Sequence, residues 1–405
     1  MTDPTGRSFL SYRRPRQSEV AMVIEAQHVR GIPTWQDIEN IDEGPTERQL
    51  RDALADETTA NGILWITPDV ADSDFIQRIE APALLKRATN NDGFFVVPVA
   101  AGGLDYDGAA AALKNALSLE DLRVWNVTMV STNPITEPEA AQIADRVLHD
   151  RLAAIHRALP AEAPLSLTLS TWAPLPFQPG TALAMDWSRQ FQGRSAKNPR
   201  IWDETLLPAL RSTVAAIEHD CPGRRVVAGG QASLTAATAL GVEFLSPRGL
   251  HVEWRQVTSG QTPQIWSLSI PAESSGFTYK IIDGDLASEE LAVLVSVTDD
   301  VSNAFTASRS DLPRLRAILH VESPATLPRI LSTAGQATDV ARIVVEGIRQ
   351  VRRERGPLTS IHLFMAAPVG LAMLIGQSLN TLGTIRTYEY AAANGKYKAE
   401  AVFQC

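Results

Sequence analysis

Cysteine is scarce in this sequence, which has only Cys221 and Cys405 among its 405 residues. Two cysteines are too few for a disulfide framework or a cysteine-based zinc site, and their scarcity is typical of a reducing compartment. The sequence also lacks the run of about 18 apolar residues that a membrane span requires, and its first residues lack the apolar core of a signal peptide. We therefore expect a cytoplasmic protein that does not insert into a membrane.

Positive charge is in the minority. The chain has 37 lysines and arginines against 46 aspartates and glutamates, which gives a formal net charge of -9. Clustered cations supply much of the affinity for a nucleic-acid backbone, so this balance argues against DNA as a partner. A small anionic ligand in a local basic pocket remains compatible with it. The seven histidines show no metal-site spacing, and we expect no metal and no resident cofactor.

Apolar residues make up 44% of the chain, as in ordinary globular proteins, and the length predicts two or three domains. Up to about residue 130, short apolar segments alternate with helical ones, which indicates an α/β fold with a parallel sheet and crossover helices. Five strands in this length predict a flavodoxin-like domain. The expected strands are 8–11, 34–35, 62–67, 94–99 and one that includes 123–125. The expected helices are 19–30, 46–56 and 75–88, the last capped by Asp72 or Ser73.

A segment rich in proline and alanine, residues 159–164, is the best domain boundary in the chain. It divides the sequence into a first domain over residues 1–130, a turn and connecting helix over 131–160, and a second domain over 161–405.

The second domain contains two segments with one pattern. Residues 225–230 predict a strand that leads into a helix ending near Gly241, and residues 362–368 predict a strand that leads into a helix ending near Gly376. The two glycines are 135 positions apart, a plausible length for one α/β unit of a fused pair. Because strand, turn and helix is also the commonest pattern of α/β folds, chance similarity remains the alternative.

A fused pair of Rossmann-like units would bind a ligand where strand carboxyl ends and helix amino termini face a shared cleft. Such a cleft suits a cyclic ligand with several phosphates. The candidates that follow expected strands are Gly230, Gln231, Ser296, Asp299, Ala367 and Pro368. The candidates for base stacking and phosphate contact are Trp187, Arg194, Lys197 and Tyr388. Ordinary packing or surface exposure is the alternative for each of them.

The amino terminus carries a second candidate site. Residues 8–14 read Ser-Phe-Leu-Ser-Tyr-Arg-Arg, which places Arg13 and Arg14 at the carboxyl end of the first strand, where guanidinium groups can grip phosphate. Glu80 follows on the third expected helix, and no other carboxylate lies between Asp74 and Asp92. These residues predict a nucleotide-handling domain. The alternatives are a solvated basic turn and an exposed helix carboxylate.

With these residues in view, the first 130 positions resemble a TIR domain. Residues 9–14 match its first-strand box, residues 35–37 and Gly44 match its second strand and the following loop, and Glu80 matches the glutamate on the helix after its third strand. Residues from about 160 to 405 resemble a SAVED domain, which is similar to two fused CARF units that sense cyclic oligonucleotides. The whole chain thus resembles the TIR-SAVED effectors of cyclic-oligonucleotide-based antiphage signalling.

This resemblance implies NAD+ as the substrate and cleavage of the bond between nicotinamide and ribose. Glu80 would stabilise the positive charge that develops on the ribose. Arg13 and Arg14 would hold the pyrophosphate or adenine side, Trp35 would stack on a ring, and the loop from Asp37 to Gly44 would cover the site.

The second domain would bind a cyclic oligoadenylate, expected to be the trimer, and drive a monomer into a head-to-tail helical oligomer. Two alternatives stay open for the first domain. It could be a non-enzymatic TIR scaffold, or it could cyclise ADP-ribose instead of hydrolysing NAD+.

Overall fold

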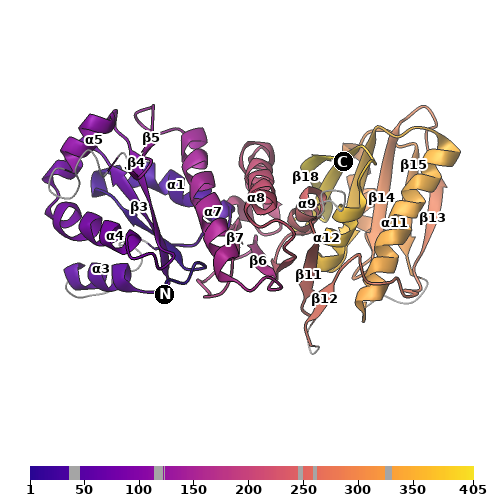
Figure 1. The fold of residues 1–405 in the computed structure, drawn as a ribbon. Coiled ribbons are helices and arrows are strands. Elements are labelled where there is room, and N and C mark those ends of the chain that lie inside the picture. The colour runs from indigo at the N-terminus through magenta and orange to yellow at the C-terminus, as the bar shows by residue number, and fades with distance from the viewer. Residues whose placement is uncertain (36–45, 114–121, 123, 245–249, 259–261, 324–330) are drawn as a thin grey trace. The chain divides into compact units, whose positions relative to one another are not determined.

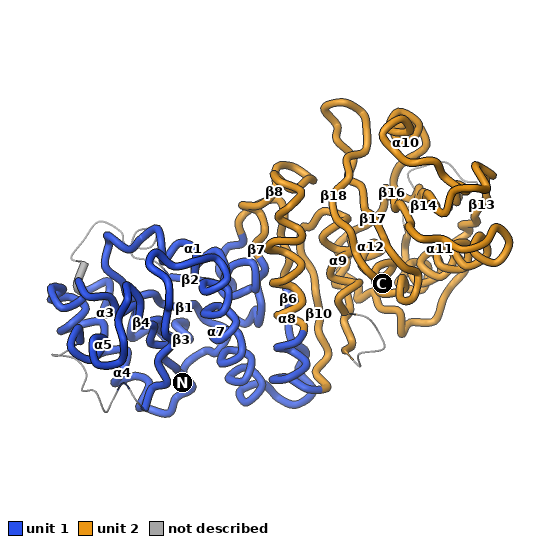
Figure 2. Tube along the Cα trace, turned by 90° about the horizontal axis from the view of Figure 1, so that it is seen from above, with its two compact units in different colours: residues 1–167, 175–185, 215–222 blue, residues 168–174, 186–214, 223–405 orange. Residues whose placement is uncertain are grey.

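The computed structural model describes residues 1–405 apart from 36–45, 114–121, 123, 245–249, 259–261 and 324–330 (Figure 1). Internal contacts divide the chain into two compact units (Figure 2). The front unit comprises residues 1–167, 175–185 and 215–222, and the second unit comprises residues 168–174, 186–214 and 223–405. No helix within the described ranges combines the length and apolar character needed to cross a membrane.

A five-stranded parallel sheet organises the front unit, in the order β2-β1-β3-β4-β5. This is the flavodoxin-like strand order. The central strand β3 is buried at every position, as expected for a parallel sheet covered on both faces. The strands are β1 (Arg7–Ser11), β2 (Thr34–Trp35), β3 (Thr59–Ile66), β4 (Phe95–Ala100) and β5 (Thr128–Met129).

The helical elements of the front unit agree with the sequence pattern in most places. They are η1 (Arg14–Arg16), α1 (Gln17–Val29), α3 (Thr46–Ala55), η2 (Pro68–Asp72), η3 (Ile76–Glu80), α4 (Ala81–Ala88), α5 (Tyr106–Ala112) and α7 (Glu137–Ala158). Ser73 caps the third expected helix, because its hydroxyl accepts from the Ile76 N–H at 3.4 Å. The expected fifth strand is wrong at residues 124–125, and residue 123 lies outside the described residues. Trp125 lies in a turn that Asn126 continues with a φ of 50°, and the strand forms at Thr128–Met129.

A proline explains why the expected helix over 75–88 is not a uniform α-helix. Pro82 has no N–H to donate to the preceding turn, and the Ala81 N–H bonds five residues back to the Ile76 carbonyl. The result is the π-helical turn η3, which contains Glu80. The same pattern recurs at η5 (Trp202–Leu206), where the Leu207 N–H reaches Trp202 and Pro208 follows. Single π-turns are often found at functional sites.

Helix α7, expected as a connector, packs within the front unit against α1. It carries Arg151, whose side chain is fully buried. The guanidinium donates to the carbonyls of Thr5 and Gly6, both at 2.6 Å, and of Ala182 at 3.0 Å. Burial lowers the pKa of Arg151 to about 10. One cation therefore satisfies three backbone acceptors from two distant segments of the unit.

Replacing Arg151 by Met is expected to lower the unfolding free energy of the front unit by about 3 kcal/mol, because three buried carbonyls lose their donors. Thermal melting monitored by circular dichroism would measure the loss. Arg157→Met on the same helix is the control, because Arg157 is exposed and donates to the Ala153 carbonyl of its own helix. Equal melting temperatures for the two variants would contradict this role of Arg151.

Two further sheets follow in the chain. The first has the order β12-β11-β10-β6-β7, and the second has the order β13-β15-β14-β16-β17-β18 with a parallel centre from β15 to β17. The prediction of an α/β chain with parallel sheets is confirmed. The strands are β6 (Leu165–Ser170), β7 (Leu183–Asp186), β10 (Val226–Gln231), β11 (Val252–Gln256), β12 (Gln264–Trp266), β13 (Thr278–Asp283), β14 (Glu290–Ser296), β15 (Ala317–Glu322), β16 (Ser360–Ala366), β17 (Thr384–Ala391) and β18 (Lys396–Gln404).

Helices and a short ribbon complete this part of the chain. They are η4 (Ser188–Gln190), the ribbon of β8 (Phe191–Gln192) and β9 (Ser195–Ala196), α8 (Leu207–Asp220), α9 (Leu234–Glu243), α10 (Ser302–Ser308), η7 (Arg309–Asp311), α11 (Ala334–Arg355) and α12 (Val369–Ser378). The elements β6, β7 and α8 contribute residues to both units.

Candidate functional site

The two repeated segments of the sequence meet in the second unit. Strand β10 leads into α9 and β16 leads into α12, and these two helices pack directly on each other. A Cβ on Gly241 would lie 2.1 Å from the Met373 carbonyl oxygen, and one on Gly376 would lie 2.4 Å from that of Thr238. The glycines expected to end the two helices therefore lie inside them. At these positions the backbones of α9 and α12 approach so closely that a side chain would not fit.

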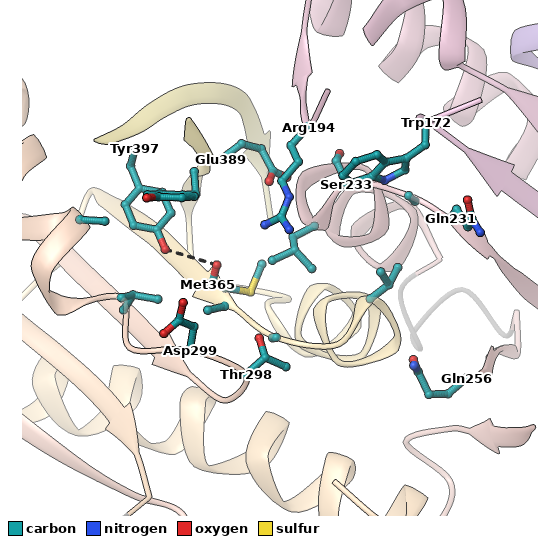
Figure 3. Close-up of a pocket in the computed structure, with 18 of the residues that line it drawn as sticks. Trp172, Arg194, Gln231, Ser233, Gln256, Thr298, Asp299, Met365, Glu389 and Tyr397 are labelled. Atoms are coloured by element: carbon teal, nitrogen blue, oxygen red, sulfur yellow. Dashed lines mark hydrogen bonds between the residues drawn. The ribbon is translucent and has the colours of Figure 1, made fainter. Parts of the chain in front are cut away.

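A cavity of about 840 Å³ opens where α9 and α12 begin (Figure 3). Their N-cap residues are Ser233 and Pro368, again 135 positions apart. The lining comes from strand ends and helix starts throughout the second unit, and its polar or aromatic members are Trp172, Arg194, Gln231, Ser233, Trp254, Arg255, Gln256, Thr298, Asp299, Asp300, Asn303, Glu389, Tyr390 and Tyr397. The volume lies within the range of small-molecule sites, towards its upper end.

Backbone geometry fixes one wall of this cavity at Gly230. Its φ is +127°, which residues with a Cβ rarely adopt, and a Cβ there would lie 2.2 Å from the Leu169 carbonyl oxygen. The adjacent Gly229 is less constrained, because its Cβ would make ordinary contacts with Arg255 at 3.5 Å. At Gly230, the turn after β10 therefore exposes main-chain atoms to the cavity with no side chain in between.

Charged side chains give the cavity its chemistry. Arg194 holds its guanidinium 5.8 Å from the centre of the Trp172 ring, and Figure 3 shows it between Trp172 and Glu389. Glu389 is 2% exposed and accepts from the Thr235 N–H at 2.7 Å. Burial raises the pKa of Glu389 to about 7, against the lowering effect of the Thr235 hydrogen bonds. The side chain can therefore change its charge near neutral pH.

The front unit places its predicted residues at the carboxyl end of β1 and beyond β3. Arg13 lies 3.8 Å from a carboxylate oxygen of Asp69, and Arg14 is exposed. Glu80 is 9% exposed at the end of η3. Trp35 is 5% exposed and stacks on Phe9 with ring centroids 4.9 Å apart, so its ring belongs to the core and cannot stack on a ligand as predicted. Asp37 and Gly44 lie outside the described residues.

One group in the front unit has the chemistry of a metal site. Nδ1 of His149 and Nδ1 of His219 lie 2.5 and 2.7 Å from the two carboxylate oxygens of Asp220. Imidazole and carboxylate ligands suit Zn²⁺. Both histidines are exposed, and hydrogen bonds to the shared carboxylate account for the geometry without an ion.

Comparison with known proteins finds a family similar to the later part of the chain. Residues 206–403 match the family model of SAVED, described as "SMODS-associated and fused to various effectors sensor domain". This part of the chain is similar to the SAVED sensor domain. No curated protein matches the sequence.

Solved structures with a similar fold include two of the Acinetobacter baumannii Cap4 SAVED/CARF-domain containing receptor. One contains the cyclic trinucleotide 3'3'3'-cAAA and the other 2'3'3'-cAAA. Each has a TM-score of 0.52 and 15% sequence identity, and the match covers 89% of this chain and 84% of that chain. At this identity the comparison shows a shared fold.

Five of the residues predicted to bind the cyclic ligand line the cavity of the second unit, namely Arg194, Gly230, Gln231, Asp299 and Ala367. Pro368 lies next to the lining as the N-cap of α12 but does not contribute to it.

Three others lie away from the lining and have other partners. Trp187 is fully buried and packs edge-to-face on Trp202, so it cannot stack on a base. Lys197 is exposed and donates to the Arg189 carbonyl at 2.6 Å. Tyr388 stacks on Phe364 and bonds through its hydroxyl to His362 at 2.7 Å.

Ser296 supports the site from beneath. It is fully buried, and its hydroxyl lies 2.8 Å from Nε2 of His320 and accepts from the Val301 N–H at 3.2 Å. These bonds hold the turn after β14, which supplies Thr298 and Asp299 to the lining.

Sequence reasoning missed several lining residues, among them Trp172, Gln256 and Glu389. All three lie near the carboxyl ends of strands: Trp172 is two residues beyond β6, Gln256 ends β11, and Glu389 is two residues before the end of β17. The rule used for the other candidates would have found them, had the ends of these strands been predicted.

Proposed function

We propose that the second unit binds a cyclic oligoadenylate, the tri-adenylate in particular. The observation that carries this proposal is the cavity of about 840 Å³ at the start of the duplicated helices α9 and α12. Helix amino termini and close backbone at Gly230 favour anionic groups there, and Trp172 with Arg194 offers a stacking surface. The cyclic trinucleotides in the two Acinetobacter structures of similar fold support the choice of ligand class.

The front unit is the proposed effector, an NAD+ glycohydrolase with a TIR fold. The parallel sheet with Arg13 and Arg14 after β1, and Glu80 after β3, supports this assignment. Loss of nicotinamide leaves an oxocarbenium-like ribose, whose positive charge one ionised carboxylate can stabilise. Glu80 has that role here, and the arginines bind phosphate. Trp35 has no part in it, because its ring is buried.

Ligand binding is proposed to switch the enzyme on through assembly. A monomer without ligand becomes a head-to-tail oligomer with it, and an open helical filament results where heterologous contacts do not close. The product is ADP-ribose or its cyclic form. The second candidate function is a non-enzymatic TIR scaffold gated by the same ligand. In either form, the protein acts in antiphage signalling.

The test combines three measurements on the purified full chain with cyclic di-, tri- and tetra-adenylates. Calorimetry measures binding, light scattering measures mass, and chromatography measures nicotinamide released from NAD+. We expect one ring size to bind, raise the mass and start nicotinamide release. Binding without release would favour the scaffold, and unchanged mass with release would exclude the assembly step.

A further inference from the structure

The lining of the cavity separates its charges by origin. Its described residues before position 258, here the basic half, contribute Arg194 and Arg255 and no carboxylate. Its described residues from position 298 onwards, here the acidic half, contribute Asp299, Asp300 and Glu389 and no lysine or arginine. A ligand with both phosphates and hydrogen-bond donors meets unlike surfaces on the two sides. The duplicated fold therefore encloses an electrostatically asymmetric space.

One matched pair of side chains makes this asymmetry testable. The N–H of Thr235, the second residue of α9, donates to Glu389 on β17 at 2.7 Å. The N–H of Gly370, the second residue of α12, donates to Gln256 on β11 at 3.1 Å. Thr235 and Gly370 are 135 positions apart, the spacing of the repeat. Glu389 of the acidic half thus caps α9, and Gln256 of the basic half caps α12. The two capping side chains have the same length and differ in charge.

Several groups face Glu389. The negative charge of Glu400 on β18 raises the pKa of Glu389, and the positive charge of Arg194 lowers it. Tyr397 of β18 interacts electrostatically with Glu389, and the Thr235 N–H of α9 donates to it. Glu400 is itself buried and accepts from the Ala196 N–H at 3.0 Å. A third negative charge brought close to these two carboxylates would be repelled in a medium of low polarity. Gln256 presents no such barrier.

Building on the proposed function, we propose that Glu389 orients the cyclic oligonucleotide and makes its binding depend on pH. The phosphates lie towards Arg255 and the Gln256 cap, and the donor groups of a base or ribose lie against Glu389. Above neutral pH the carboxylate weakens binding of the polyanion. Below it, the protonated acid removes the repulsion, so affinity rises as the pH falls from 8 to 6.

Reciprocal changes of the two caps test this inference by calorimetry with 3'3'3'-cyclic tri-adenylate. At pH 8, Glu389→Gln is expected to bind about tenfold more tightly than wild type, because the cap stays and the charge goes. Gln256→Glu is expected to bind about tenfold more weakly. Between pH 8 and pH 6 the wild-type affinity is expected to rise by about the same factor, and that of Glu389→Gln to stay constant.

The control is Glu346→Gln on the exposed face of α11, which makes the same change in net charge away from the cavity. Wild-type binding that neither cap variant alters, or weaker binding by Glu389→Gln, would overturn the inference and leave the proposed function intact. If the wild type binds none of the cyclic oligoadenylates, the proposed function fails first and the inference with it.

Discussion

Glu80→Gln is expected to reduce ligand-stimulated nicotinamide release by about a thousandfold. The amide keeps the size of the side chain and removes the charge that would face the developing positive ribose, and groups of this kind are worth roughly 10²–10³ in rate or more. Chromatographic measurement of nicotinamide at saturating cyclic tri-adenylate would give the ratio. Asp74→Asn is the control, because Asp74 lies at the start of the same helical segment and forms an exposed ion pair with Arg78 at 3.5 Å.

Light scattering on Glu80→Gln measures whether the variant still assembles, and this distinguishes a catalytic defect from an assembly defect. If Glu80→Gln assembles at the same ligand concentration as the wild type, its loss of nicotinamide release is due to a defect in the chemical step. Full activity in Glu80→Gln would contradict the catalytic role of this carboxylate. A variant that no longer assembles would point to a role of Glu80 in packing, since the side chain is 9% exposed.

Gly230→Ala is expected to cost about 3–5 kcal/mol in stability and to abolish ligand binding. The added Cβ meets the Leu169 carbonyl oxygen at 2.2 Å, and the φ of +127° is itself strained for alanine. Thermal melting of the full chain and calorimetry with cyclic tri-adenylate would measure the two effects. The strand end must move to accept the methyl group, and the cavity wall moves with it.

Gly229→Ala provides a control one residue away. Its Cβ would lie 3.5 Å from the Cβ of Arg255, an ordinary contact, and Gly229 does not line the cavity. We expect a melting temperature and an affinity close to wild type. Equal melting temperatures and affinities for Gly230→Ala and Gly229→Ala would contradict the prediction. They would show that the backbone around Gly230 accommodates a methyl group at little cost.

The parts of the fold that were predictable from sequence rest on local patterns. The first four expected strands of the front unit overlap β1 to β4, although the fifth was misplaced, and Ser73 caps its helix as its position before the apolar run indicated. The repeat was visible because Gly241 and Gly376 recur in similar surroundings. Their function in close helix packing was not visible, because a glycine near a helix end also reads as a terminator.

The remainder depends on contacts between distant segments. Trp187 is in the core because Trp202 covers it, and sequence alone does not separate a buried tryptophan from a stacking platform. Glu389 reads as an ordinary strand residue until Thr235 and Glu400 are placed around it. Local periodicity identifies the strand, but only tertiary packing shows which strand ends share a cavity.

The crossing of α9 and α12 at two glycines also has a mechanical consequence. Each glycine is the eighth residue of its helix, so each helix extends about 10 Å from the crossing to the start that faces the cavity. With the backbones already in contact, the helices can change their angle more easily than their separation. A rotation of about 10° at this pivot displaces a helix start by about 2 Å. Because both helix starts border the cavity, a change in the crossing angle would change the distance between these two parts of its wall.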